Sequence, residues 1–125
     1  MAALKSNDPL VERFYELGVY PAWWKLPPDT DPAAWQSIGD AIRANASGCS
    51  GILILGQGFT GSRLAQSFAA AATEPLCKGF AVGRSIYAQP ARRWLTGEAS
   101  DEEFISQTSA NYEEMIELWR QSTSK

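Results

Sequence analysis

The chain has 125 residues, a formal net charge of −3 at pH 7 and no histidine. Its length predicts one compact domain, residues 1–125, and is roughly half of what a complete (βα)8 barrel requires. The acidic balance, without a run of Lys or Arg, argues against nucleic acid or an anionic membrane as a partner. The absence of histidine excludes Ser-His-Asp catalysis, Cys-His catalysis and His-ligated metal sites within these residues.

The sequence also bears on where the protein is found. No stretch approaches the roughly 20 apolar residues that a membrane-spanning helix needs. Residues 1–7 lack the apolar core of a secretory signal. Cys49 and Cys77 are far apart and outside any CxxC pattern, so we expect reduced thiols. Together these features predict a cytoplasmic protein. We separately expect no cofactor and no metal.

A helix is predicted at the start of the chain. Leu10, Phe14 and Leu17 recur at helical spacing and share one face. Pro9 suits a first helical position, and Gly18 suits the C-terminal stop.

Three strands are predicted after this helix. The first covers residues 19–26 (VYPAWWKL) and ends at Pro27, because proline cannot donate a hydrogen bond to a sheet. Residues 51–55 (GILIL) form a continuous apolar run, which is typical of a strand buried in a parallel sheet. Residues 78–82 (KGFAV) form the third and shortest candidate.

Helices are predicted between and after these strands. Asp31 can cap a helix that runs to about Ala46, before a break at Ser47-Gly48. A second helix follows the turn at residues 56–61, and a short one covers residues 90–95. The last helix opens with a capping-box signature at Ser100. Its predicted packing face carries Phe104, Thr108, Tyr112, Met115 and Trp119.

Strands that alternate with helices predict right-handed βαβ units and a parallel sheet. The expected fold is therefore α/β, a partial (βα)8-type barrel of three parallel βα units. An N-terminal helix and a long C-terminal helix complete it.

Lys25 is the first candidate for chemistry, because it lies among Trp23, Trp24 and Leu26 at the end of a strand. A partly desolvated lysine has a lowered pKa and can form a Schiff base with a carbonyl substrate. The alternative is a lysine whose alkyl chain covers the tryptophans while its ammonium group stays in water.

Two glycine turns are the other candidates. Residues 56–61 (GQGFTG) follow a strand and open a helix, which suits a phosphate cradle, a dinucleotide-binding turn or a plain tight turn. The dinucleotide version requires an acidic residue at the end of the next strand. That strand instead ends at Gly83 and Arg84, a glycine and a guanidinium that suit phosphate oxygens. Two such turns after consecutive strands resemble the phosphate site of (βα)8 enzymes.

Several segments resemble the aldolase-like C-terminal domain of bacterial 5-dehydro-2-deoxygluconokinases of myo-inositol catabolism. They are residues 15–26 (YELGVYPAWWKL), 78–87 (KGFAVGRSIY), 94–98 (WLTGE) and the helix start at 100–103 (SDEE). The resemblance covers roughly residues 10–121.

This resemblance implies a class I aldolase-type barrel in which the three strands are the sixth, seventh and eighth. It implies that Lys25 is the Schiff-base lysine and that Gly56, Gly58, Gly83 and Arg84 bind the substrate phosphate. The related reaction would be retro-aldol cleavage of 5-dehydro-2-deoxygluconate 6-phosphate to dihydroxyacetone phosphate and malonate semialdehyde, a lyase reaction of carbohydrate metabolism.

The chain departs from the resembling family in two ways. Pro27 stands where we expect an acidic residue, and the strands that would carry general acids and bases are absent. Glu16 and Tyr87 are local candidates for that acid–base role, but nothing in the sequence places either beside Lys25. A non-catalytic sugar-phosphate-binding or oligomerisation unit, and a dinucleotide-binding module, therefore remain alternatives. Three strands leave two edges open, so we also expect a homo-oligomer or association with the remainder of a larger barrel.

Overall fold

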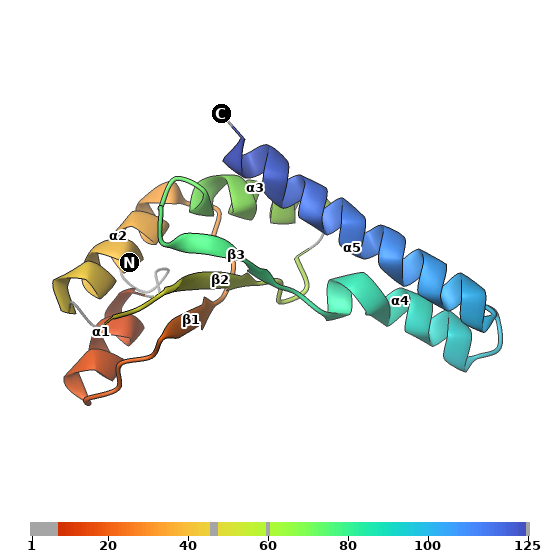
Figure 1. Cartoon of the computed structure of the whole chain (residues 1–125), viewed down its shortest axis with the longest axis horizontal. Coiled ribbons are helices and arrows are strands. Elements are labelled where there is room, and N and C mark those ends of the chain that lie inside the picture. Colours follow the sequence, from red (N-terminus) through yellow and green to blue (C-terminus); the bar gives the residue numbers. More distant parts are fainter. Residues whose placement is uncertain (1–7, 46–47, 60, 125) are drawn as a thin grey trace.

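The computed structural model describes residues 8–45, 48–59 and 61–124 (Figure 1). The predicted helix end at Ala46, the break at Ser47, Thr60 of the first glycine turn and residues 1–7 lie outside the described residues. The helices and strands, in chain order, are α1 (Asp8–Glu16), β1 (Trp23–Leu26), α2 (Pro32–Asn45), β2 (Gly51–Leu55), α3 (Gly61–Ala71), β3 (Cys77–Ala81), α4 (Arg84–Leu95) and α5 (Asp101–Thr123).

The three strands form one parallel sheet in the order β1-β2-β3. Each connection between neighbouring strands contains a helix, which is the arrangement that parallel pairing requires. The predicted α/β fold, with three parallel βα units between an N-terminal helix and a long C-terminal helix, is confirmed. The arrangement is that of part of an α/β barrel.

One face of the sheet packs against the helices and forms the core. Trp24 on β1 donates its indole N–H to the Tyr15 hydroxyl of α1 at 3.0 Å. On β3, the Phe80 ring stacks on Phe68 of α3, with ring centroids 5.4 Å apart. Trp35 of α2 is completely buried within the same layer. These contacts join β1 to α1 and β3 to α3 within one apolar layer.

The opposite face of the sheet, called the open face below, is much more exposed. Its exposed or half-buried side chains include Trp23, Lys25, Leu53, Leu55 and Ala81. Parallel sheets are usually covered on both faces.

The pairing of β2 with β3 contains an irregularity at Lys78. Ile52 pairs with Cys77, but the next residue, Leu53, pairs with Gly79, so Lys78 is left without a partner in the ladder. Such a bulge adds one residue to one strand only. Phe80 consequently lies beside Ile54, on the core side of the sheet.

The first helix buries a different face from the one that the sequence suggested. Leu10 and Leu17 are about 60% exposed, whereas Val11 and Tyr15 are buried. Both stripes of α1 contain apolar residues. The Trp24 ring meets Phe14 and Tyr15 edge-on at similar distances, but only Tyr15 is buried and accepts the Trp24 hydrogen bond.

Two predicted boundaries were wrong. Strand β1 begins at Trp23 rather than residue 19, because the chain first turns back on α1: the Val19 N–H donates to the Phe14 carbonyl, and the Tyr20 ring lies 5.3 Å from Tyr15. Helix α4 begins at Arg84 and contains Pro90, so it is longer than the predicted segment at residues 90–95.

The last two helices form an antiparallel hairpin that reaches beyond the sheet (Figure 1). The predicted capping box is confirmed, since the Ser100 hydroxyl accepts from the Glu103 N–H and the Glu103 carboxylate accepts from the Ser100 N–H. At the far end, the Trp94 ring stacks on Phe104. Within the described part of the chain, no helix is long and apolar enough to cross a membrane.

Candidate functional site

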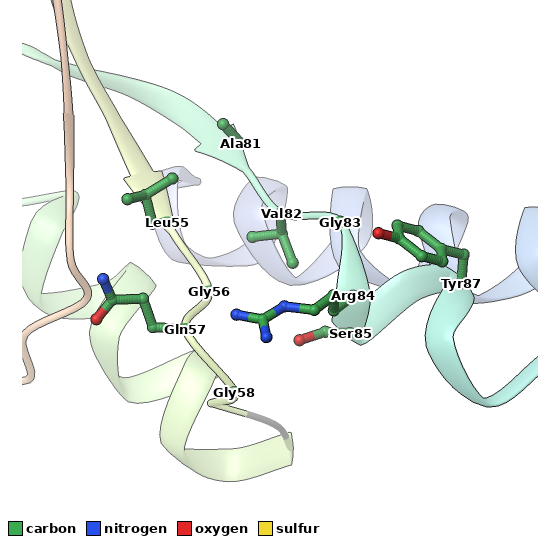
Figure 2. A pocket seen from close by; sticks show the side chains of 10 residues that line it. All are labelled: Leu55, Gly56, Gln57, Gly58, Ala81, Val82, Gly83, Arg84, Ser85 and Tyr87. Atoms are coloured by element: carbon green, nitrogen blue, oxygen red, sulfur yellow. The ribbon is translucent and has the colours of Figure 1, made fainter.

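A pocket lies where β2 and β3 end (Figure 2). Its volume is about 390 Å³. The lining residues come from the last residues of the two strands, from the turns that follow them and from the start of α4: Leu55, Gly56, Gln57, Gly58, Ala81, Val82, Gly83, Arg84, Ser85 and Tyr87. In parallel α/β sheets, ligands bind at this carboxyl edge of the strands.

The pocket brings together the four residues that the sequence suggested for phosphate binding. Gly56 and Gly58 come from the turn after β2, and Gly83 and Arg84 come from the turn after β3. A side chain at Gly56 would crowd the pocket, because a Cβ there would lie 3.0 Å from Val82 Cγ1. The glycine thus lets the two turns approach each other.

Arg84 is the positive group of the site. It is exposed, it is the first residue of α4, and it forms no ion pair or hydrogen bond with any residue that the structure describes. Figure 2 shows its guanidinium reaching back toward the turn after β2. Gly83 is the residue before α4, and it has no side chain that could accept a hydrogen bond from the first N–H groups of this helix. The first N–H groups of α4 therefore add to the positive potential around Arg84.

Ser85 connects the two turns. Its hydroxyl donates to the Phe59 carbonyl at 3.3 Å, and the Phe59 N–H closes the first turn by donating to the Gly56 carbonyl at 2.9 Å. Arg63 of α3 covers the Phe59 ring, with its guanidinium carbon 3.9 Å from the ring centroid. These contacts hold the two halves of the pocket in a fixed relation.

Gln57 was not singled out from the sequence. With φ of 47°, it is the only non-glycine residue at positive φ in the described part of the chain. This left-handed conformation costs a side-chain-bearing residue about 1–2 kcal/mol. The signal that could have found it is its place between Gly56 and Gly58, where a tight turn requires unusual backbone angles.

Lys25 does not line this pocket, and its position on β1 distinguishes the two alternatives predicted for it. Alternation along β1 puts Trp24 and Leu26 in the core, while Lys25 projects from the open face with Trp23. Lys25 is exposed, which agrees with the alternative in which its ammonium group stays in water. Lys25 pairs with Leu53, and Leu55, two residues further along β2, lines the pocket. The lysine and the pocket therefore belong to the same side of the sheet.

The two candidate acid–base residues are separated in the structure. Tyr87 lines the pocket and is 47% exposed. Glu16 lies in α1 and forms an exposed ion pair with Arg13 at 3.2 Å. Of the two, only Tyr87 is positioned to meet a ligand at the ends of β2 and β3.

The remaining reactive groups lie away from the pocket. Cys49 and Cys77 are both free, and burial, followed by the nearby Glu74 carboxylate, raises the pKa of Cys77 to about 12. Among the described residues, no group of three or more Cys, Asp or Glu side chains is arranged to hold a metal ion.

Comparison with known proteins supplies a family. A search of curated proteins and a search of solved structures found no match. One family model matches residues 4–123, that of DUF2090, described as an uncharacterized protein conserved in bacteria. Because this match covers nearly the whole chain, the protein belongs to the DUF2090 family.

Proposed function

We propose that the chain binds the phosphate group of a small phosphorylated metabolite in the pocket at the ends of β2 and β3. One observation carries this proposal. Gly56 and Gly58, from one turn, and Gly83 and Arg84, from another, line a single pocket in which Arg84 has no partner among the described residues.

The pocket offers two kinds of group to an anion. The Arg84 guanidinium can donate two parallel hydrogen bonds to phosphate oxygens, which makes such contacts strong and directional. The glycine turns allow backbone N–H groups to approach the same oxygens. A phosphate would stabilise the folded chain by binding only its native form.

Thermal denaturation with added ligand tests this proposal. We expect millimolar dihydroxyacetone phosphate or inorganic phosphate to raise the melting temperature of the wild-type chain. Arg84→Ala should weaken binding at least tenfold, because it removes the charged donor. Arg92→Ala is the matched control, since Arg92 is exposed on the same helix but does not line the pocket. An unchanged wild-type transition, or equal losses in both variants, would count against phosphate binding at this site.

A second candidate function is Schiff-base aldolase chemistry at Lys25. The observation that favours it is that Lys25 and the pocket lie on the same side of the sheet, linked along β2 by Leu53 and Leu55. A keto-sugar phosphate held at the pocket could extend across the open face toward the lysine. The resemblance to an aldolase-like domain supports the same chemistry, a carbon–carbon lyase reaction.

Borohydride trapping tests this second candidate. Incubation with dihydroxyacetone phosphate and borohydride should add the mass of the reduced adduct to Lys25, and Lys25→Ala should abolish that adduct. Lys78→Ala is the matched control, because Lys78 is an exposed lysine of the same sheet. A wild-type chain without an adduct, or an adduct that survives in Lys25→Ala, would exclude the lysine as the nucleophile.

We also propose that the chain works in the cytoplasm as part of a larger assembly, either a homo-oligomer or a more complete barrel. In the described part of the chain, β1 and β3 each pair with β2 alone, so each presents an unpaired edge. Unpaired edges and an uncovered sheet face favour association. Sedimentation at micromolar concentration should show a dimer or larger species, whereas a purely monomeric profile would contradict self-association.

A further inference from the structure

Gln57 occupies a position where glycine would fit the backbone better. Its φ of 47° falls in the left-handed region, and glycine stands immediately before and after it. A glycine at this position would adopt the same turn without strain. Strained residues of this kind cluster at ligand-binding sites, where the side chain has a use that offsets the cost.

The Gln57 amide is available to a ligand. The side chain is exposed, it lines the pocket, and it forms no hydrogen bond with any residue in the described ranges. Packing and internal hydrogen bonds therefore give no reason for a glutamine in this turn. Contact with a ligand would give one.

The position of Gln57 relative to Arg84 suggests a division of roles. Figure 2 shows the Arg84 guanidinium pointing toward the turn, while the Gln57 side chain leaves the turn on the side away from Arg84. Both residues also line a second, shallower hollow, with Gly58 and Ser85. One small molecule could therefore place an anionic end at Arg84 and a neutral polar end at Gln57.

The chemistry of the amide narrows what that second end can be. A carboxamide offers both donors and an acceptor but carries no charge. It therefore suits a hydroxyl or carbonyl group rather than a second phosphate. We infer that Gln57 is a specificity-determining residue that binds a hydroxyl or carbonyl group at the end of the ligand away from the phosphate, so the pocket selects small phosphorylated polyhydroxy or keto compounds over inorganic phosphate. This inference rests on the proposed phosphate-binding function.

Calorimetric titration of the wild type, Gln57→Gly and Gln57→Asn with two ligands tests the inference. We expect the wild type to bind dihydroxyacetone phosphate more tightly than inorganic phosphate. Gln57→Gly should weaken binding of dihydroxyacetone phosphate about tenfold, the effect of about one hydrogen bond, and change binding of inorganic phosphate less than twofold. Gln57→Asn keeps an amide in a residue that tolerates positive φ. It should therefore lose less affinity for dihydroxyacetone phosphate than Gln57→Gly does.

A measurement without ligand tests the strain separately. Gln57→Gly should raise the melting temperature of the unliganded chain by a few degrees, on the order of 4 °C. A lower melting temperature would overturn the argument from backbone strain.

The outcomes separate this inference from the proposed function. If the wild type binds both ligands but Gln57→Gly weakens them equally, or weakens neither, the specificity role is overturned and phosphate binding stands. If the wild type binds neither ligand, both proposals fall.

Discussion

The two ends of β3 place arginines in opposite situations. At the entry to the strand, Arg43 of α2 reaches the buried Glu74 carboxylate, with 2.5 Å between Nη2 and Oε2. At the exit, Arg84 has no partner among the described residues. The difference teaches that the amino end of the sheet is arranged for stability, whereas the carboxyl end keeps its charge available. The same division of roles is found in (βα)8 enzymes.

Glu74 is the centre of the amino-terminal arrangement. Its carboxylate accepts from Arg43 and, at 2.7 Å, from the Leu76 backbone N–H just before β3. It also lies directly against Gly39 of α2, where a Cβ would overlap the carboxylate. One buried side chain therefore joins α2 to the start of β3.

The largest effect that we expect comes from Glu74→Ala. The change removes both hydrogen bonds and should lower the free energy of unfolding by about 2–3 kcal/mol, measured by urea denaturation. Asp40→Ala is the control, because the Asp40 carboxylate contacts the same Arg43 at 3.3 Å but is 80% exposed. Asp40→Ala should lower the free energy of unfolding by less than about 0.5 kcal/mol. Equal losses in the two variants would remove the distinction on which the comparison rests.

Gly39→Ala tests whether contact with Glu74 limits this helix position. Alanine is the better helix former by about 1 kcal/mol, yet the added methyl group must displace the Glu74 carboxylate. We expect a net loss of about 1–2 kcal/mol in urea denaturation. In a Glu74→Ala background the same change should become neutral or stabilising, because the obstacle is gone. If Gly39→Ala still lowered the free energy of unfolding in that background, a neighbour other than Glu74 would be responsible.

The Cys77 thiol, at the amino end of β3, should make the free energy of unfolding depend on pH. Its pKa of about 12 in the folded chain lies above its usual value of 9.0, so folding favours the protonated form. The stabilisation is complete below pH 9 and is lost as the pH rises toward 12, because the unfolded chain ionises first. We expect unfolding free energy to fall about 1 kcal/mol more in the wild type than in Cys77→Ala between pH 8 and pH 10. Parallel pH profiles would contradict this assignment.

The smallest effect on stability is expected at the carboxyl end. Arg84→Ala should change the free energy of unfolding of the unliganded chain by less than about 0.5 kcal/mol. Arg43→Ala should cost about 1–2 kcal/mol, because it leaves the Glu74 carboxylate buried without its charged partner. If Arg84→Ala were the more destabilising change, the pocket arginine would have a structural role that the contacts do not reveal.

The sequence was sufficient to predict the features that are encoded by a few consecutive residues. The apolar run at residues 51–55, the glycines that follow two strands and the capping box at Ser100 are each contained in a few consecutive residues. Because the carboxyl ends of parallel strands share one edge, the meeting of Gly56 and Arg84 also followed from the predicted sheet.

Features that depend on distant partners could not be predicted in this way. Tyr15 in the buried stripe of α1 is held by a hydrogen bond from Trp24, nine residues further along the chain. The role of Glu74 depends on Arg43, which precedes it by a whole strand–helix unit. The exposure of Lys25 follows from strand alternation together with the lack of cover on the open face. The strain at Gln57 comes from its positive φ, which cannot be predicted from its residue type.

The bulge at Lys78 determines which face of the sheet each later residue of β3 occupies. Side chains alternate between the two faces of a strand, so one inserted residue reverses the assignment of all later positions. With the bulge, Gly79 lies beside Leu53 on the open face and Phe80 enters the core. Without it, Phe80 would face outward and leave the contact with Phe68 unmade. A single unpaired residue at the entry of β3 thus determines which of the later side chains of this strand enter the core.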